Sequence, residues 1–189
     1  MPVGSLKNTL YALALPVLGK RGGWNASTAL EKVLRKHHAI GAAVQQFEKG
    51  RLTRCDCVGY ASGSTPVVRE TVFRTASVAK MVTALLMFRL QTKGLLDVEE
   101  DVSALLGYPV RNSLFPDTAI TLGMLLSHTS SIVDSQAYFA SFAQPVELQR
   151  LFKSSGAFGA YEPGTRFRYS NLAAGMIGCA LEKRFGMTL

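Results

Sequence analysis

The chain has 189 residues, of which 48% are hydrophobic and 18% charged, and its formal net charge is +8. This composition excludes a disordered chain, and 17 glycines with only three cysteines exclude collagen-like and disulfide-stapled proteins. The longest apolar run, Leu172–Leu181, has ten residues, about half of what a membrane-spanning helix needs. These numbers alone predict one soluble globular domain without a transmembrane span.

The positive charge lies in the first half of the chain. Residues 1–93 hold 14 Lys and Arg against 4 Asp and Glu, whereas residues 94–189 hold 7 against 9. The basic residues are scattered and do not alternate with aromatic residues, as those of a single-strand binder do. We therefore expect a solvated basic face and no nucleic-acid partner.

The three cysteines predict no metal site and no disulfide. Cys55 and Cys57 are two residues apart, so on a strand they point to the same face and are poorly placed to form a disulfide. Cys179 fits a small apolar position on a helix, and no second Cys/His cluster accompanies the pair. We interpret all three as reduced thiols, which slightly favours a reducing compartment.

The N-terminal segment, residues 1–24, carries a short apolar stretch, Leu10–Leu18, after Lys7. The stretch is a weak match to the core of a secretory signal, because Pro16 breaks it and no small-residue cleavage pattern follows it. We interpret it as a packing helix, with cleavage of the segment left open. A cytoplasmic location is thereby slightly favoured over a secreted or periplasmic one.

Residues 25–76 predict one helix followed by a β-hairpin. Thr28 opens a capping-box pattern, and the helix runs to about His38. The segments Ile40–Phe47 and Leu52–Tyr60 flank a Lys-Gly turn and are rich in small and β-branched residues, which is typical of two antiparallel strands.

From residue 77 to residue 189 the pattern is helical. The expected helices are, in chain order, Ser77–Lys93, a short helix ending at Leu106, one after the cap Thr121, one after Pro145, and one from Ser170 to Phe185. In the first of them, Met81, Ala84, Leu85 and Phe88 recur at three- and four-residue spacing, which predicts that they form its buried face.

The first candidate for chemistry is the pair Ser77 and Lys80. Residues three apart lie on one face of a helix, so the ammonium is placed beside the hydroxyl. A serine hydroxyl is a poor nucleophile until a neighbour takes its proton, and a partly buried lysine is suited to that role. A position at a helix N-terminus also favours the oxyanion of acyl transfer. The two-position pattern alone is also found in ordinary capped helices.

The second candidate is the pair Tyr169 and Asn171, which lies between a Pro-Gly turn and the start of the last helix. A phenol near a lysine is suited to act as a base, and an amide is suited to orient a substrate carbonyl or the lysine. A core tyrosine beside a helix-capping asparagine is the alternative interpretation of the same residues.

The order and spacing of the motifs resemble the serine β-lactamase and penicillin-binding superfamily. The resemblance is closest to the branch of class C β-lactamases, D-alanyl-D-alanine carboxypeptidases and related esterases. It rests on the segments Phe73–Lys80, Lys93–Asp97, Ile120–Ile132 and Pro163–Asn171, and it extends from about residue 25 to the last residue.

The resemblance implies an α+β fold of the β-lactamase/transpeptidase type. Residues 25–76 would supply the N-terminal helix and hairpin of its mixed sheet, and residues 77–189 most of its all-helical domain. The later strands and the C-terminal helix of the family lie outside this sequence. No cofactor and no metal are expected, because the chemistry is covalent and acid–base.

The resemblance also assigns roles. Ser77 would be the acylated nucleophile, Lys80 its partner in proton transfer, Tyr169 the base or proton relay, and Asn171 a contact to substrate or to Lys80. Which of Lys80 and Tyr169 takes the proton stays open. His128 would be structural, and a serine at position 131 replaces the usual glycine of its turn, which would strain it.

The family's third motif, Lys-Thr-Gly or His-x-Gly on a late strand, does not occur in the sequence. That strand supplies the second oxyanion N–H of the family, and losing one such donor costs about 10²–10³ in turnover. We therefore expect a serine hydrolase acting on a β-lactam, a D-amino-acid peptide or a small ester, with little activity as this chain alone. A complementing C-terminal segment would restore it, and a non-catalytic penicillin-binding sensor or a degenerate relative is the alternative.

Overall fold

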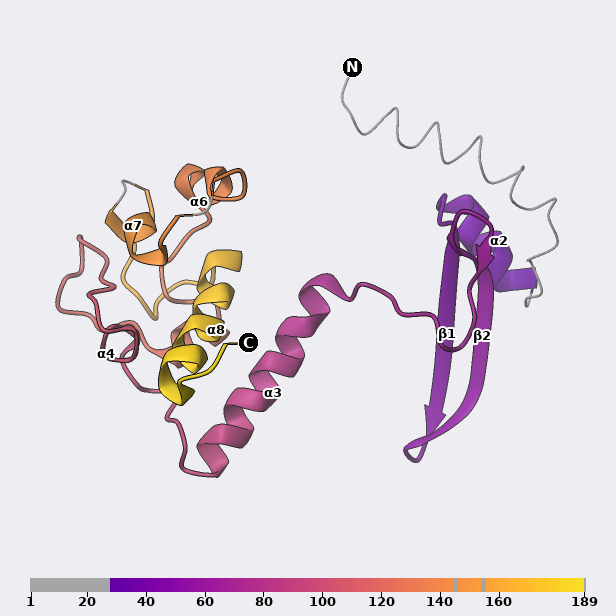
Figure 1. Cartoon of the computed structure of the whole chain (residues 1–189), viewed down its shortest axis with the longest axis horizontal. Coiled ribbons are helices and arrows are strands. Elements are labelled where there is room, and N and C mark those ends of the chain that lie inside the picture. The colour runs from indigo at the N-terminus through magenta and orange to yellow at the C-terminus, as the bar shows by residue number, and fades with distance from the viewer. Residues whose placement is uncertain (1–27, 145, 154–155, 189) are drawn as a thin grey trace, which may run out of the picture. The chain divides into compact units, whose positions relative to one another are not determined.

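The computed structural model describes residues 28–144, 146–153 and 156–188 (Figure 1). The interpretations that concern residues 1–24 therefore lie outside the described residues. The chain divides into two compact units, and the boundary in the sequence lies between Arg74 and Thr75. Each unit is described by itself.

The first unit contains one helix and a small antiparallel sheet (Figure 1). Its elements are α2 (Thr28–Lys36), β1 (Gly41–Glu48), β2 (Arg51–Ser62) and β3 (Thr65–Pro66), and the strand order is β1-β2-β3. The register of the hairpin pairs Gly41 with Gly59 and Glu48 with Arg51. The hairpin confirms the two strands predicted from the sequence, whereas the two residues of β3 are too few to leave a pattern.

Glycines permit the close approach of β1 and β2 near the start of the hairpin. A Cβ atom at Gly41 would collide with the carbonyl of Tyr60, and one at Gly59 would collide with the carbonyl of Ile40. Gly59 also has a φ of +75°, a conformation that favours glycine. Close to these glycines, Val58, Tyr60 and Val67 are buried and belong to the apolar interior of the unit.

The second unit is helical. Its elements are the 3₁₀ turn η1 (Ala76–Val78), α3 (Ala79–Thr92), α4 (Val102–Leu106), α5 (Leu122–Leu126), α6 (Gln136–Ala140), α7 (Leu148–Lys153) and α8 (Asn171–Phe185). Of these, α6 was not predicted, although the side chain of Ser135 caps it as that of Thr121 caps α5. Within the described part of the chain, every helix is too short or too polar to cross a membrane.

Helix α8 runs through the core of the second unit. Six of its residues are buried, and they pack with buried side chains of α4 and α5 (Leu172, Ala173, Met176, Ile177, Ala180, Leu181). Leu122 and Leu125 of α5 are fully buried beside them. Ser170 caps the helix by accepting a hydrogen bond from the N–H of Ala173, and Gly186 ends it with a φ of +63°.

The predicted buried face of α3 is wrong. Met81, Leu85 and Phe88 are exposed by 62%, 64% and 55%, and the one fully buried residue of the helix is Met87. The physical reason is that apolar residues surround nearly the whole helix, so their spacing does not single out one face.

The loop from His128 to Asp134 runs beside the segment that leads into α8. Backbone N–H groups of Arg168, Gly164 and Gly159 donate to carbonyls of this loop, and Ile132 forms a bridge with Phe158. Ser131 has a φ of +61°, which is the strain expected where a serine replaces glycine. Its hydroxyl accepts a hydrogen bond of 3.1 Å from the buried Asn112 amide, a contact that glycine would lack.

Candidate active site

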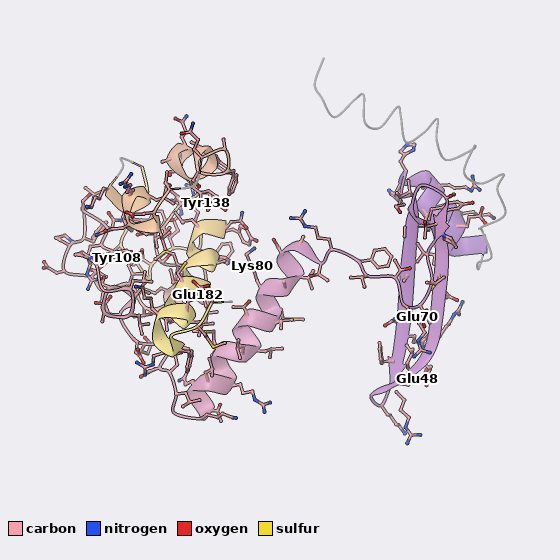
Figure 2. All side chains as sticks on the ribbon, in the orientation of Figure 1. Glu48, Glu70, Lys80, Tyr108, Tyr138 and Glu182 are labelled. Atoms are coloured by element: carbon pink, nitrogen blue, oxygen red, sulfur yellow. The ribbon has the colours of Figure 1, made fainter. Side chains whose placement is uncertain are left out.

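Ser77 and Lys80 lie at the start of the long helix of the second unit. Ser77 is in the 3₁₀ turn η1, and Lys80 is in the first turn of α3, with its side chain near the N-terminal end of the helix (Figure 2). Ala76, immediately before the serine, has a φ of +46°, which is uncommon for a residue with a Cβ atom and costs about 1 kcal/mol. Local strain of this kind is frequent at functional positions.

Tyr169 and Asn171 flank the cap of α8. Ser170 is extended and caps the helix, so the residues before and after it project from its N-terminal end. Asn171 is the first residue of the helix, and the Tyr169 side chain is 44% exposed.

The structure brings these four predicted residues together. The Ser77 Oγ lies 2.7 Å from the Tyr169 hydroxyl oxygen, although 92 positions separate the two residues in sequence. The Lys80 Nζ donates to the Ser77 Oγ at 3.2 Å and to the Asn171 Oδ1 at 3.0 Å. The same ammonium lies 5.2 Å from the centre of the Tyr169 ring. Lys80 thus contacts each of the other three side chains, and Ser77 also contacts the phenol.

The electrostatics of the cluster favour ionisation of the phenol. The Lys80 ammonium beside it is the largest cause and the Ser77 hydroxyl the second, and together they hold the pKa of Tyr169 below its usual value. Both donate toward the phenolate oxygen and thereby stabilise the ionised form. An oxygen of this kind, 2.7 Å from a serine hydroxyl, is placed to accept its proton.

His128 lies behind Tyr169. The two ring centres are 4.4 Å apart, and the N–H of Ser170 donates to the His128 Nδ1 at 3.4 Å. Burial, followed by the positive charge of Lys80, lowers the pKa of His128, so the imidazole is neutral near pH 7. It also lines a small cavity of about 40 Å³ beside Lys80 and Thr83. Its contacts are those of a packing residue that supports the ring of Tyr169.

Asp134 is a carboxylate at the site that the sequence analysis did not single out. Its side chain accepts hydrogen bonds from the backbone and the amide of Asn171. No pattern in the sequence marked it, because an isolated aspartate before a serine is common in loops. Among the described residues, no group of three His, Cys, Asp or Glu side chains is arranged to hold a metal ion.

The fold is of the β-lactamase type, as comparison with known proteins shows. The sequence model of the Beta-lactamase family matches residues 26–189. The chain therefore belongs to the β-lactamase family, a family of serine hydrolases, and the resemblance drawn from its motifs is confirmed.

Individual relatives agree with this assignment. Penicillin-binding protein 4* of Bacillus subtilis is 28% identical over 167 residues, which cover 84% of this chain and 36% of that protein. The D-alanyl-D-alanine-carboxypeptidase/endopeptidase AmpH of Escherichia coli is 30% identical over 121 residues, which cover 62% of this chain and 31% of that protein. The chain thus spans about a third of the length of these relatives.

The solved structures support the fold. The octameric penicillin-binding protein homologue of Pyrococcus abyssi superposes with a TM-score of 0.70 at 22% identity, over 85% of this chain and 39% of that one. The expected α+β fold of the β-lactamase/transpeptidase type is confirmed.

Proposed function

We propose that this chain carries the acylation site of a serine hydrolase, with Ser77 as its nucleophile. The observation that carries the proposal is the contact of Ser77 with both Tyr169 and Lys80. Two segments about ninety positions apart in sequence meet at that hydroxyl. If Ser77 only capped a helix and Lys80 only faced solvent, this contact between distant segments would not be needed. The substrate we propose is a β-lactam, a D-amino-acid peptide or a small ester.

In the proposed reaction Tyr169 takes the proton of Ser77. The phenol oxygen is the nearer of the two candidate bases, and its pKa is lowered by Lys80 and Ser77. Lys80 donates hydrogen bonds to Ser77 and Asn171, so its protons stabilise the ionised phenol and hold the serine in place. This division of roles favours Tyr169 as the base over Lys80.

With a β-lactam, the reaction opens the four-membered ring and leaves the product bound to Ser77. The Ser77 Oγ forms a bond with the ring carbonyl carbon, the ring C–N bond breaks, and the nitrogen takes the proton that Tyr169 received. No atom leaves, so the acyl-enzyme gains the mass of the intact β-lactam. With a peptide or an ester the amine or alcohol departs with the same proton.

The test is labelling with a fluorescent penicillin. We expect covalent label on the chain, none on Ser77→Ala, and nearly unchanged label on the matched control Thr75→Ala, which removes a hydroxyl two residues away. Equal label on Ser77→Ala, or no label on the unsubstituted chain, would contradict the proposal. Label that persists without release would favour the alternative, a penicillin-binding sensor without turnover.

We further propose that turnover depends on a segment that carries the Lys-Thr-Gly or His-x-Gly motif. Residues 25–76 and 77–189 would then be the corresponding parts of the sheet domain and the helical domain. A family-like segment with that motif, added in trans, should raise hydrolysis by about 10²–10³, the usual effect of an oxyanion donor. Hydrolysis of nitrocefin by the chain alone at the same rate would contradict this dependence.

A further inference from the structure

Asp134 lies in a loop whose backbone is fixed on both sides. Immediately before it, Ile132 bridges Phe158, and the N–H of Val133 donates to the carbonyl of Ala157 at 3.0 Å. Immediately after it, Ser135 caps α6 by accepting from the N–H of Tyr138. The backbone on both sides of Asp134 is therefore held by the fold of the loop.

The Asp134 carboxylate accepts four hydrogen bonds from the start of α8. Its Oδ1 accepts from the Ser170 hydroxyl at 2.8 Å and from the N–H of Leu172 at 3.0 Å. Its Oδ2 accepts from the N–H of Asn171 at 3.0 Å and from the side-chain Nδ2 of Asn171 at 3.1 Å. Both oxygens are used fully, and the negative charge lies at the positive pole of a 15-residue helix.

These contacts determine which way the Asn171 amide points. A carboxylate only accepts and an ammonium only donates, so the NH₂ group must face Asp134 and the oxygen must face Lys80. The reversed amide would set oxygen against carboxylate and NH₂ against ammonium, and both contacts would be repulsive. The 3.0 Å bond from Lys80 to the Asn171 Oδ1 therefore depends on Asp134.

Another residue shares the capping of α8 with Asp134, which itself accepts from the backbone N–H groups of Asn171 and Leu172. The Ser170 hydroxyl accepts from the N–H of Ala173 at 3.0 Å, as a capping side chain does. Of the four bonds to Asp134, the one from Asn171 Nδ2 contributes nothing to the helix backbone. The effect of that bond is to orient the side-chain amide of Asn171.

The charge of Asp134 is maintained by the same contacts. Burial opposes its ionisation, but the hydrogen bonds from Leu172, Asn171 and Ser170 outweigh burial and hold the pKa of the carboxyl below its usual value. Other titratable groups that face it are His128, Tyr138 of α6 (Figure 2) and Tyr169. The acceptor is thus ionised throughout the neutral range.

We propose that Asp134 is a positioning residue of the acylation site. It acts through Asn171: by binding the NH₂ group, it directs the amide oxygen to Lys80 and so fixes the ammonium beside Ser77 and Tyr169. The proposal rests on the proposed function for its kinetic consequence, whereas its structural part, the orientation of the amide, stands independently.

The kinetic test is a double-mutant cycle on the rate of penicillin labelling. Asp134→Asn keeps the shape and removes the charge and an acceptor, and we expect it to lower the labelling rate about 10- to 100-fold, as misplacement of a catalytic group does. Asn171→Ala should lower the rate similarly. In the Asn171→Ala background, Asp134→Asn should have almost no further effect, because its target is gone.

The matched control is Ser170→Ala. It removes the cap and one bond to Asp134, but it leaves the bond between Asp134 and the Asn171 amide. We expect less than a threefold loss of labelling, at a temperature where circular dichroism shows all variants folded. If Asp134→Asn labels at the unsubstituted rate, if its effect multiplies with that of Asn171→Ala, or if Ser170→Ala is equally slow, the proposal is overturned.

A spectroscopic test does not depend on activity. The side-chain amide signals of Asn171 are assigned by their loss in Asn171→Ala, on ¹⁵N-labelled protein. We expect one amide proton to be protected from exchange and shifted downfield, to lose both properties in Asp134→Asn, and to keep them in Ser170→Ala. An unchanged signal in Asp134→Asn would overturn the inference. A chain that shows the expected signals but takes no label would contradict the proposed function alone.

Discussion

The two long helices of the second unit each carry half of the site, and they are held in different ways. Helix α8 has six buried residues, a side-chain cap and a carboxylate at its N-terminus. Helix α3, one residue shorter, has one buried residue and no side-chain cap. The half that contains Tyr169 and Asn171 is therefore fixed by the core of the unit. The half that contains Ser77 and Lys80 has fewer buried residues, and it also contacts the other half within the site.

The difference shows where the site is built. A network of hydrogen bonds links the loop at Asp134, the start of α8 and Lys80. Through Lys80, this network reaches the start of α3. Substitutions at the site should thus lower the labelling rate strongly. Substitutions of apolar residues should lower the free energy of unfolding more in α8 than in α3.

The largest effect is expected from the two groups that contact the Ser77 hydroxyl. Lys80→Ala and Tyr169→Phe should each lower the rate of penicillin labelling by about 10²–10⁴, the usual contribution of a positioned acid or base. Lys80→Arg should also label slowly, because a guanidinium differs from an ammonium in shape. A Tyr169→Phe variant that labels at the unsubstituted rate would show that the phenol is not the base.

The pH dependence of labelling should identify the base. Since the pKa of Tyr169 is lowered from 10.0, the labelling rate should rise with pH, with a midpoint below pH 10. In Tyr169→Phe this rise should disappear, because the group that must lose its proton is gone. A rise with the same midpoint in both proteins would assign the titration to another group.

A matched pair of methionines tests the unequal anchoring of the helices. Met176 of α8 is fully buried, and Met176→Ala should lower the free energy of unfolding by about 2–5 kcal/mol. Met81 of α3 is 62% exposed, and Met81→Ala should change it by less than about 0.5 kcal/mol. Urea denaturation measures both. A cost above about 2 kcal/mol at Met81 would mean that another surface covers this face of α3.

The smallest effect is expected at acid pH. The folded-state pKa of Asp134 lies below 3.8, so its stabilising contribution is present above that pH and is lost as pH falls through the folded value. The midpoint of urea denaturation should decrease between about pH 5 and pH 2, and less steeply in Asp134→Asn. An identical slope in the two proteins would mean that the carboxylate has no linkage to folding.

The elements with strong local signals were predictable from the sequence. The hairpin follows from β-branched segments around a Lys-Gly turn, and the end of α8 follows from its terminal Gly186, whereas its cap is Ser170 and not Asn171. The four site residues were identified from their motifs, and in the structure a chain of hydrogen bonds links Tyr169 to Ser77, Ser77 to Lys80 and Lys80 to Asn171. Their catalytic roles remain a proposal.

Two features were not predictable, for physical reasons. The buried side of α3 was missed because a helix that is apolar on nearly all sides has no preferred face in its sequence. The contribution of Asp134 was missed because it depends on a loop and a helix 37 positions apart in sequence. Contacts of this kind are set by tertiary structure and leave no local pattern.

The most direct test of the central claim is the position of the acyl group. Trypsin cuts after Arg74 and Lys80, so the peptide of residues 75–80 contains Ser77 as its sole serine. After exposure of the chain to penicillin, we predict that mass spectrometry finds this peptide heavier by one intact penicillin, with fragments that place the addition on Ser77. An unmodified peptide, or an adduct on another residue, would contradict the account.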